Sequence, residues 1–164
     1  MYKILVFGLA LVLFSSLKPS EVNYQSIESV VNTSLACISG DQGVPRNFEL
    51  FKTLYHKDAK LCFIQKGDSG KEMGALTIDK FTEVSAQSYE AYGFYEAAIK
   101  NTIDSFGSIA NVFQSYEASV PLKDYKIRGI NSYQLVFEKG RWWIINEIYD
   151  EEKGDLLIPE KYLK

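Results

Sequence analysis

The most strongly patterned stretch of the chain runs from Arg128 to Asp150. Two runs rich in Ile, Val, Tyr, Phe and Trp flank the short segment Glu138-Lys139-Gly140-Arg141. β-Branched and aromatic residues favour strands, and a glycine in a tight hairpin turn supplies the positive φ that the turn requires. The pattern therefore predicts two long antiparallel strands joined by a turn at Gly140.

Neither face of this hairpin is polar throughout. Because alternate side chains of a strand point to opposite faces, the first strand divides into Asn131, Tyr133, Leu135 and Phe137 against Ile130, Ser132, Gln134 and Val136. The second divides into Trp142, Ile144, Asn146 and Ile148 against Trp143, Ile145, Glu147 and Tyr149. A hairpin that is apolar on both sides is either covered on both sides or lines a cavity. Aromatics mixed with amides are typical of a pocket wall; the alternative is a sheet with helices on one face and a dimer partner or further core on the other.

Helical spacing dominates the front of the chain. Residues 21–39 place apolar side chains along one side of a predicted first helix, which ends at Gly40. Asn47 can cap a short second helix that stops at His56. Asp79 can cap a third helix that stops at Gly93. Further strands are predicted at 59–65, 75–78, 94–106 and 108–120. The tail, which ends Leu156-Leu157-Ile158-Pro159 before its last five residues, is expected along the sheet edge. The order α-α-β-β-α-β-β-β-β predicts an α+β domain with helices on one face of a curved antiparallel sheet.

This order resembles that of the nuclear transport factor 2-like (NTF2-like) superfamily, which includes the SnoaL-like proteins. The resemblance covers about residues 21–150. Three short sequence motifs support it: Pro45-Arg46-Asn47-Phe48, Leu54-Tyr55-His56-Lys57-Asp58-Ala59 and Gly140-Arg141-Trp142-Trp143-Ile144-Ile145. The resemblance implies a cone-shaped, strongly curved sheet with three helices packed on it and a conical pocket between them. In different members that pocket is a hydrolase, isomerase or dehydratase site, a ligand-binding site or a vestige, so the fold does not fix the function.

Residues 1–19 have the composition of an export signal. Lys3 precedes the apolar run Ile4–Phe14, and Ser15 and Ser16 follow it. The run is short for a membrane span, which takes about 20 residues. We therefore expect a cleaved signal peptide at 1–19, a single domain at 20–164, an exported (periplasmic or extracellular) protein of bacterial type, and no membrane contact beyond the signal. Removing residues 1–19 deletes two lysines and no acid, which changes the formal charge from −3 to −5.

Composition excludes several classes of function. Hydrophobic residues make up 46% and aromatics 14% of the chain, which argues for a packed globule. The acidic balance without a Lys or Arg cluster argues against nucleic-acid binding. A single histidine, without CxxC or HExxH spacing, argues against a metal site, and no cofactor motif is present. Cys37 and Cys62 are either bridged or two buried thiols, and the sequence leaves this open.

The expected pocket residues come from the long strands. They are Tyr95, Tyr116, Asn131, Tyr133, Trp142 and Asn146. Each has a structural alternative, since strand tyrosines usually pack and buried amides can bond one another. Two residues are candidates for a general base, His56 and Glu147, although His56 equally fits a helix end and most strand glutamates are solvated.

Two classes of function remain. The first is an exported binding protein that holds a small, mostly apolar molecule without chemistry. The second is a hydro-lyase or isomerase that uses His56 or Glu147 as base and a tyrosine such as Tyr95 or Tyr116 as oxyanion donor. The resemblance supplies no matched catalytic set, because neither the carboxylic base of ketosteroid isomerase-like members nor the His and Asp of scytalone dehydratase-like members maps onto this chain. A base beside a tyrosine hydroxyl in the cavity would favour the enzyme. A homodimer through the sheet face is expected with either function.

Overall fold

Three helices form at the front of the described chain, each started by a side-chain cap. The computed structural model describes residues 21–68 and 70–164. Helix α1 (Ile27–Ile38) begins after Ser26, whose side chain accepts a hydrogen bond from the Ser29 N–H, and α2 (Phe48–Leu54) begins after Asn47, which confirms the predicted cap. Helix α3 (Ile78–Tyr92) is capped by Thr77 rather than by Asp79, and it ends at Gly93, where φ is +69°.

Six strands make one sheet. They are β1 (Tyr55–Gly67), β2 (Gly70–Thr77), β3 (Tyr95–Phe106), β4 (Ile109–Val120), β5 (Tyr125–Glu138) and β6 (Arg141–Glu151), in the spatial order β2-β1-β6-β5-β4-β3. All neighbouring pairs are antiparallel except β1 and β6, which run parallel. The β5–β6 turn has positive φ at Lys139 and Gly140, as the sequence predicts for Gly140.

Strand β1 is longer than the sequence predicts. It starts at Tyr55, directly after α2, because Tyr55 already pairs with Ile144 of β6. His56 therefore lies on a strand and not at a helix end. Strand β5 also starts earlier than expected, at Tyr125, because the β4–β5 pairing extends to Val120 and Tyr125. The helix and strand order is nevertheless the predicted one, and the α+β class is confirmed.

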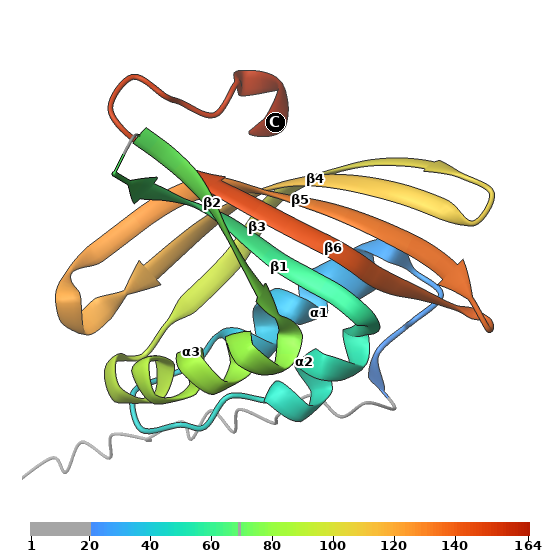
Figure 1. Ribbon diagram of the computed structural model, residues 1–164, viewed down its shortest axis with the longest axis horizontal. Helices are drawn as coiled ribbons and strands as arrows, with labels where there is room; N and C mark the ends of the chain where they lie inside the picture. Colours follow the sequence, from blue (N-terminus) through green and yellow to red (C-terminus); the bar gives the residue numbers. More distant parts are fainter. Residues whose placement is uncertain (1–20, 69) are drawn as a thin grey trace, which may run out of the picture.

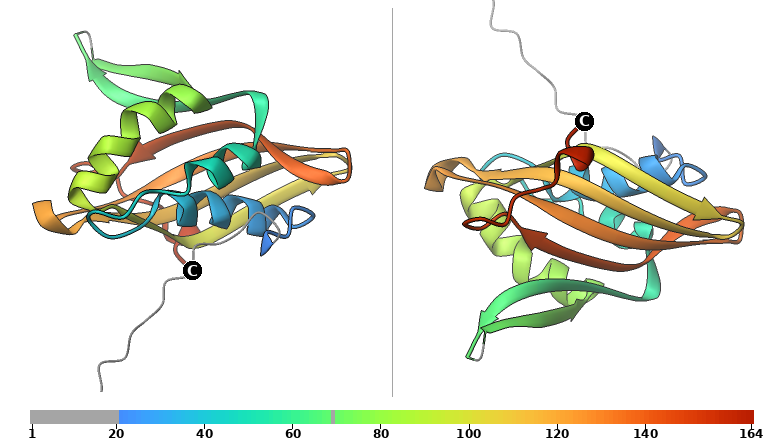
Figure 2. Two further views of the ribbon diagram at one scale, coloured as in Figure 1. Left: turned by 90° about the horizontal axis from the view of Figure 1, so that it is seen from below. Right: turned by 90° about the horizontal axis from the view of Figure 1, so that it is seen from above.

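The helices and the C-terminal tail lie on opposite faces of the sheet (Figure 1). We call these the inner face, toward the helices, and the outer face. The chain runs from β2, at one edge of the sheet, through α3 to β3, at the other edge, so α3 crosses the inner face (Figure 2). The tail was expected along a sheet edge. It crosses the outer face instead, where the Ser115 hydroxyl donates to the Tyr162 carbonyl at 2.5 Å and the Phe113 and Tyr162 rings lie 4.9 Å apart.

Two register shifts change which side chains reach the inner face. In β6, Gln134 pairs with Asn146 and Leu135 with Ile144, so Ile145 is an extra residue between the two pairs. In β3, Ile99 is the extra residue between Ala98 and Lys100. A β-bulge of this kind breaks the strict alternation of faces and bends the strand.

The core lies between the inner face and the helices. Among its fully buried side chains are Val30, Phe51, Leu54, Tyr133 and Ile144. Cys37 and Cys62 are both buried and both free, so they do not form a disulfide. The predicted export signal, residues 1–19, lies outside the described residues. Of the described helices, none has the length and apolarity needed to cross a bilayer.

Candidate functional site

A cavity of about 200 Å³ lies between the inner face and the three helices. Helices α1, α2 and α3 and every strand except β2 contribute to its wall, which includes Tyr125, a residue that is 46% exposed. The lining is largely aromatic and aliphatic, with glutamates and one asparagine as its strongly polar members. The lining residues are Ser34, Leu35, Ile38, Phe51, Tyr55, Leu61, Phe81, Tyr89, Phe94, Glu96, Tyr116, Ala118, Tyr125, Ile127, Asn131, Glu147, Tyr149 and Glu151.

Glu147 reaches this cavity from β6, two residues after the bulge. It is 6% exposed, and its carboxylate accepts a 2.5 Å hydrogen bond from the Tyr55 hydroxyl. Burial raises the pKa of Glu147 to about 7, and the hydrogen bond from the Tyr55 hydroxyl partly counters that rise because it favours the charged form. A carboxyl with this pKa exchanges its proton near neutral pH, which suits a general acid or base.

Glu96 enters the same cavity from β3. Its carboxylate accepts a 2.9 Å hydrogen bond from the Asn131 amide. Burial raises the pKa of Glu96 to about 8; the Asn131 bond lowers it, and the charge of Glu147 raises it further. The residue as a whole keeps some accessible surface, which we attribute to the cavity because the carboxyl lies on its wall.

A chain of amides supports Glu96 from behind. Asn131 also donates to Gln114 Oε1 at 3.3 Å, and the Gln114 amide nitrogen donates to Asn101 at 2.8 Å and to Asn32 at 3.2 Å. Tyr133 donates to the same Gln114 oxygen at 3.3 Å. Because Gln114 and Asn131 are 0% and 2% exposed, these bonds satisfy groups that would otherwise be buried without partners.

The Tyr116 hydroxyl makes no hydrogen bond to a described residue. Tyr116 is 4% exposed and lines the cavity from β4. Its ring crosses β5 at Gly129, where an added Cβ would lie 2.4 Å from the Tyr116 oxygen and 2.6 Å from the Asp150 carbonyl. Glycine is therefore required at 129 for the ring to lie there. Burial raises the pKa of Tyr116, so the hydroxyl keeps its proton.

The predicted pocket residues divide between the cavity and other places. Asn131, Tyr116 and Glu147 line it. Tyr133 is fully buried immediately behind the wall and bonds Gln114. Of the two expected bases, Glu147 lies beside a tyrosine hydroxyl, which was the arrangement expected of an enzyme.

Three predicted pocket residues lie elsewhere. Trp142 packs edge-on against Phe137 at 5.3 Å, in the core beyond the cavity. Asn146 faces outward, 3.9 Å from Cys62 Sγ, because the bulge exchanges its face with that of Glu147. Tyr95 bonds Asp41 in the loop after α1.

His56 also lies outside the cavity. It sits at the start of β1, with Nδ1 3.6 Å from Asp58 and Nε2 4.0 Å from Glu138, and its ring meets Trp143 edge-on. The longer β1 explains this placement, since strand geometry directs the side chain to the outer face.

Several wall residues were not predicted as site residues. Tyr55 lines the cavity from the first position of β1 and Tyr89 lines it from α3, and Tyr149 shares its predicted face with Glu147. Glu96 carries a detectable signal, an acid within the apolar segment Phe94–Ala98, but periodicity alone does not tell its face.

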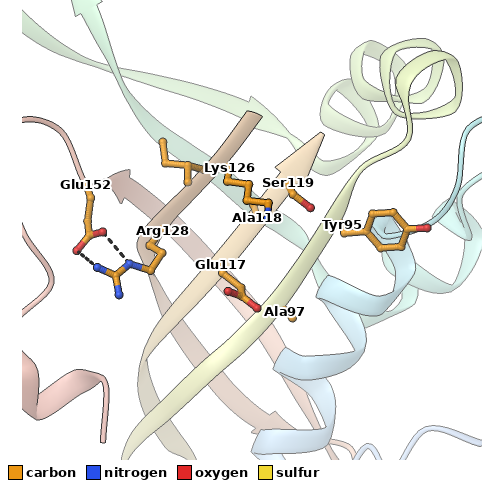
Figure 3. Close-up of a pocket in the computed structure, with 9 residues that line it drawn as sticks. Tyr95, Ala97, Glu117, Ala118, Ser119, Lys126, Arg128 and Glu152 are labelled. Atoms are coloured by element: carbon orange, nitrogen blue, oxygen red, sulfur yellow. Dashed lines mark hydrogen bonds and ion pairs between the residues drawn. The ribbon is translucent and has the colours of Figure 1, made fainter. Parts of the chain in front are cut away.

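A second, larger hollow of about 550 Å³ lies along β3, β4 and β5 (Figure 3). Its charged members are Glu117, Lys126, Arg128 and Glu152, and Arg128 pairs with Glu152 at 2.8 Å. Glu117, Lys126 and Arg128 are exposed, so this outer groove provides a solvated surface of mixed charge. The smaller inner cavity is the better candidate site, because desolvated titratable groups converge there.

No family model matches the chain, and no curated protein matches its sequence. In the part of the chain that the structure describes, no three His, Cys, Asp or Glu side chains are grouped so that they could hold a metal ion.

Solved structures do match the fold. An NTF2-like protein of unknown function from Methylobacillus flagellatus KT is 19% identical, with a TM-score of 0.54 over 77% of this chain and 90% of its own. One from Pseudomonas putida KT2440 is 9% identical, with a TM-score of 0.57 over 75% and 82%. A protein of unknown function from Mycobacterium tuberculosis is 10% identical, with a TM-score of 0.60 over 79% and 76%. The chain therefore has the NTF2-like fold.

The two cavity glutamates predict an unusual dependence of stability on pH. In the unfolded chain a glutamate has a pKa near 4.5, whereas the folded chain holds these protons up to about 7 and 8. Between these pH values the folded chain binds more protons than the unfolded chain. The free energy of unfolding is therefore highest below about pH 4.5 and falls as the pH rises through 8. Urea unfolding should show the decline, and Glu96→Gln should raise the unfolding free energy at high pH by roughly 1–3 kcal/mol. Equal effects of Glu96→Gln and of Glu117→Gln, which changes an exposed acid, would contradict this.

The Asn131 amide is predicted to be both structural and electrostatic. Asn131→Leu removes the donor to Glu96 and to Gln114, so it should lower the unfolding free energy by about 1–3 kcal/mol. It should also move the pKa of Glu96 above 8, because the lost bond favours the charged carboxylate. Unfolding at low pH and a carboxyl NMR titration measure the two effects. Asn111→Leu, at an exposed position of β4, is the matched control. Unchanged stability with loss of a bound molecule would instead make Asn131 a ligand contact alone.

Proposed function

We propose that the chain is a small-molecule-binding protein whose ligand occupies the inner cavity. The observation that supports this best is the cavity itself, about 200 Å³ bounded by packed helices and a curved sheet. Ligand sites are typically concave, mostly apolar and supplied with a few converging polar groups. Here Phe51, Phe81 and Tyr89 form much of the apolar wall, and Glu96, Asn131 and Glu147 converge on it. A small, mostly apolar molecule fits that composition.

Export and dimerisation belong to the same proposal. The composition of residues 1–19 supports export to the periplasm or beyond the cell. Exposed apolar side chains of the outer face, including Ile145 at 39% exposure, support a homodimer through that face.

Acid–base catalysis is the second candidate function, favoured by the contact between Glu147 and Tyr55. Glu147 as a carboxylate would take a proton from the carbon next to a carbonyl group, and the free Tyr116 hydroxyl would donate to the carbonyl oxygen as negative charge develops there. Return of the proton at another carbon gives an isomerase, and loss of a neighbouring hydroxyl with the proton gives a hydro-lyase. The role proposed for His56 is withdrawn, because His56 lies outside the cavity.

Filling the cavity should abolish binding without unfolding the chain. Ala118→Phe places a ring in the cavity, because Ala118 is a buried wall residue on the inner side of β4. Native mass spectrometry of the protein purified from its producing cells should show a small-molecule adduct that Ala118→Phe loses. Ala97→Phe, at an exposed position of β3, should keep the adduct. The same spectra give the subunit count. An adduct retained in Ala118→Phe would place the ligand outside the cavity.

The catalytic candidate predicts proton exchange. A cyclic ketone incubated with the protein in D₂O should gain deuterium next to its carbonyl group, as followed by ¹H NMR. Glu147→Gln, nearly equal in shape, should reduce the exchange rate by about 100-fold or more, the scale of a lost general base. Exchange no faster than in buffer, for ketones that bind the cavity, would rule out this chemistry and leave the binding function standing.

A further inference from the structure

The charged groups on the cavity wall all have one sign. Among the described residues that line the cavity, Glu96, Glu147 and Glu151 alone have a formally charged side chain, and none is Lys, Arg or His. The nearby Arg46 does not face the cavity, because it donates to the carbonyls of Gly40 and Tyr89 at 2.6 and 2.7 Å. A ligand that brings a positive charge would therefore meet no repulsion and two buried carboxyls.

Aromatic rings make up much of the wall that these carboxyls share. The rings of Tyr89 and Phe94 stack at 4.4 Å, Phe51 and Phe81 lie 5.5 Å apart, and Tyr149 and Tyr116 complete the wall. The face of an aromatic ring carries negative potential and attracts cations, more strongly in a desolvated site. The ring-rich wall thus favours the same sign of charge as the glutamates.

Unused hydrogen-bond acceptors point into the same space. The Tyr116 hydroxyl has no partner in the described chain although Tyr116 is 4% exposed. Only Oε1 of Glu96 is engaged, by Asn131, which leaves Oε2 as an acceptor. Neither oxygen is sealed off from the cavity, since Arg46 Nε is the only side-chain nitrogen or oxygen of the described residues that is buried without a partner. A ligand with N–H donors could therefore bond both oxygens.

We propose that the cavity ligand is an organic cation, a compact and mostly apolar molecule with one protonated amine that is held by Glu96 and the Tyr116 hydroxyl among the aromatic rings. This inference rests on the proposed binding function and names its ligand class. A neutral carbonyl compound, which would accept a hydrogen bond from protonated Glu96, is the rival occupant.

The two occupants depend on pH in opposite directions. The titratable groups that face the amine position are three glutamates and five tyrosines. The glutamates are Glu96 from β3 and Glu147 and Glu151 from β6; the tyrosines are Tyr55 (β1), Tyr89 (α3), Tyr116 (β4), Tyr125 (β5) and Tyr149 (β6). The wall residues from α1 and α2 are not titratable. The tyrosines keep their protons, since burial raises the pKa of Tyr55, Tyr89, Tyr116, Tyr125 and Tyr149. Glu96 and Glu147 lose theirs with pKa values of about 8 and 7. A cation therefore binds more tightly as pH rises, and a carbonyl acceptor binds less tightly.

Three small molecules of similar size separate these cases: benzylamine, benzyl alcohol and acetophenone. Each is titrated into the protein and followed by NMR shifts of cavity residues. At pH 8 benzylamine should bind at least about tenfold more tightly than the two neutral compounds. Its affinity should rise about 50-fold between pH 6 and pH 8, because Glu96, with a pKa of about 8, must lose one proton to bind the cation. Glu96→Gln should remove most of this preference, and Glu117→Gln, which changes an exposed acid of the outer groove, should retain it.

Each other outcome overturns the inference in a distinguishable way. If benzyl alcohol or acetophenone binds as tightly as benzylamine, the cation proposal fails and the binding function stands. If none of the three shifts a cavity resonance, both fail. A loss in Glu117→Gln instead would move the cation to the outer groove and overturn the assignment. Circular dichroism checks the fold of Glu96→Gln, and should that variant unfold, Ala118→Phe, which blocks the cavity, replaces it.

Discussion

The extra residue in β6 determines the chemistry of the cavity. Ile145 has no partner in the β5–β6 ladder, so Ile144 before it and Glu147 after it both face inward. With strict alternation, Asn146 would occupy the wall and Glu147 would face outward. The bulge in β3 has the same effect, because it allows both Glu96 and Asn101 to point inward. Bulges next to functional sites commonly re-aim a side chain in this way.

Two carboxyls in one small cavity constrain each other. Each is desolvated, and the charge of Glu147 opposes the ionisation of Glu96. Hydrogen bonds offset part of the cost of burying these carboxyls, because Asn131 donates to Glu96 and Tyr55 donates to Glu147. Near neutral pH both carboxyls are therefore close to the point at which protonated and charged forms are equally populated. A salt bridge would shift each carboxyl fully to its charged form. Such poised groups occur mainly where a protein binds or transforms something.

The fold could be predicted from the sequence further than the site could. The apolar stripe of α1, the Asn47 cap, the Gly93 stop and the Gly140 turn are local signals, and local signals fix the order of elements. The faces of Asn146 and Glu147 could not be predicted, because a bulge is set by pairing between strands and leaves no mark in periodicity. His56 was placed at a helix end because the parallel pairing that extends β1 joins residues far apart in the sequence.

The last residues of the chain cover part of the outer face of the sheet. The Tyr162 ring lies 4.9 Å from that of Phe113, and Lys100 reaches the carbonyl of Lys161 at 2.9 Å, so the middle of β3 and β4 is covered there. Ile145 of β6, which is 39% exposed, lies outside the covered part. A second copy that docks at Ile145 would lie directly behind the strand that carries Glu147. The subunit contact and the cavity would then lie on opposite faces of β6. The packing of one subunit against another could therefore alter the position of the Glu147 carboxyl.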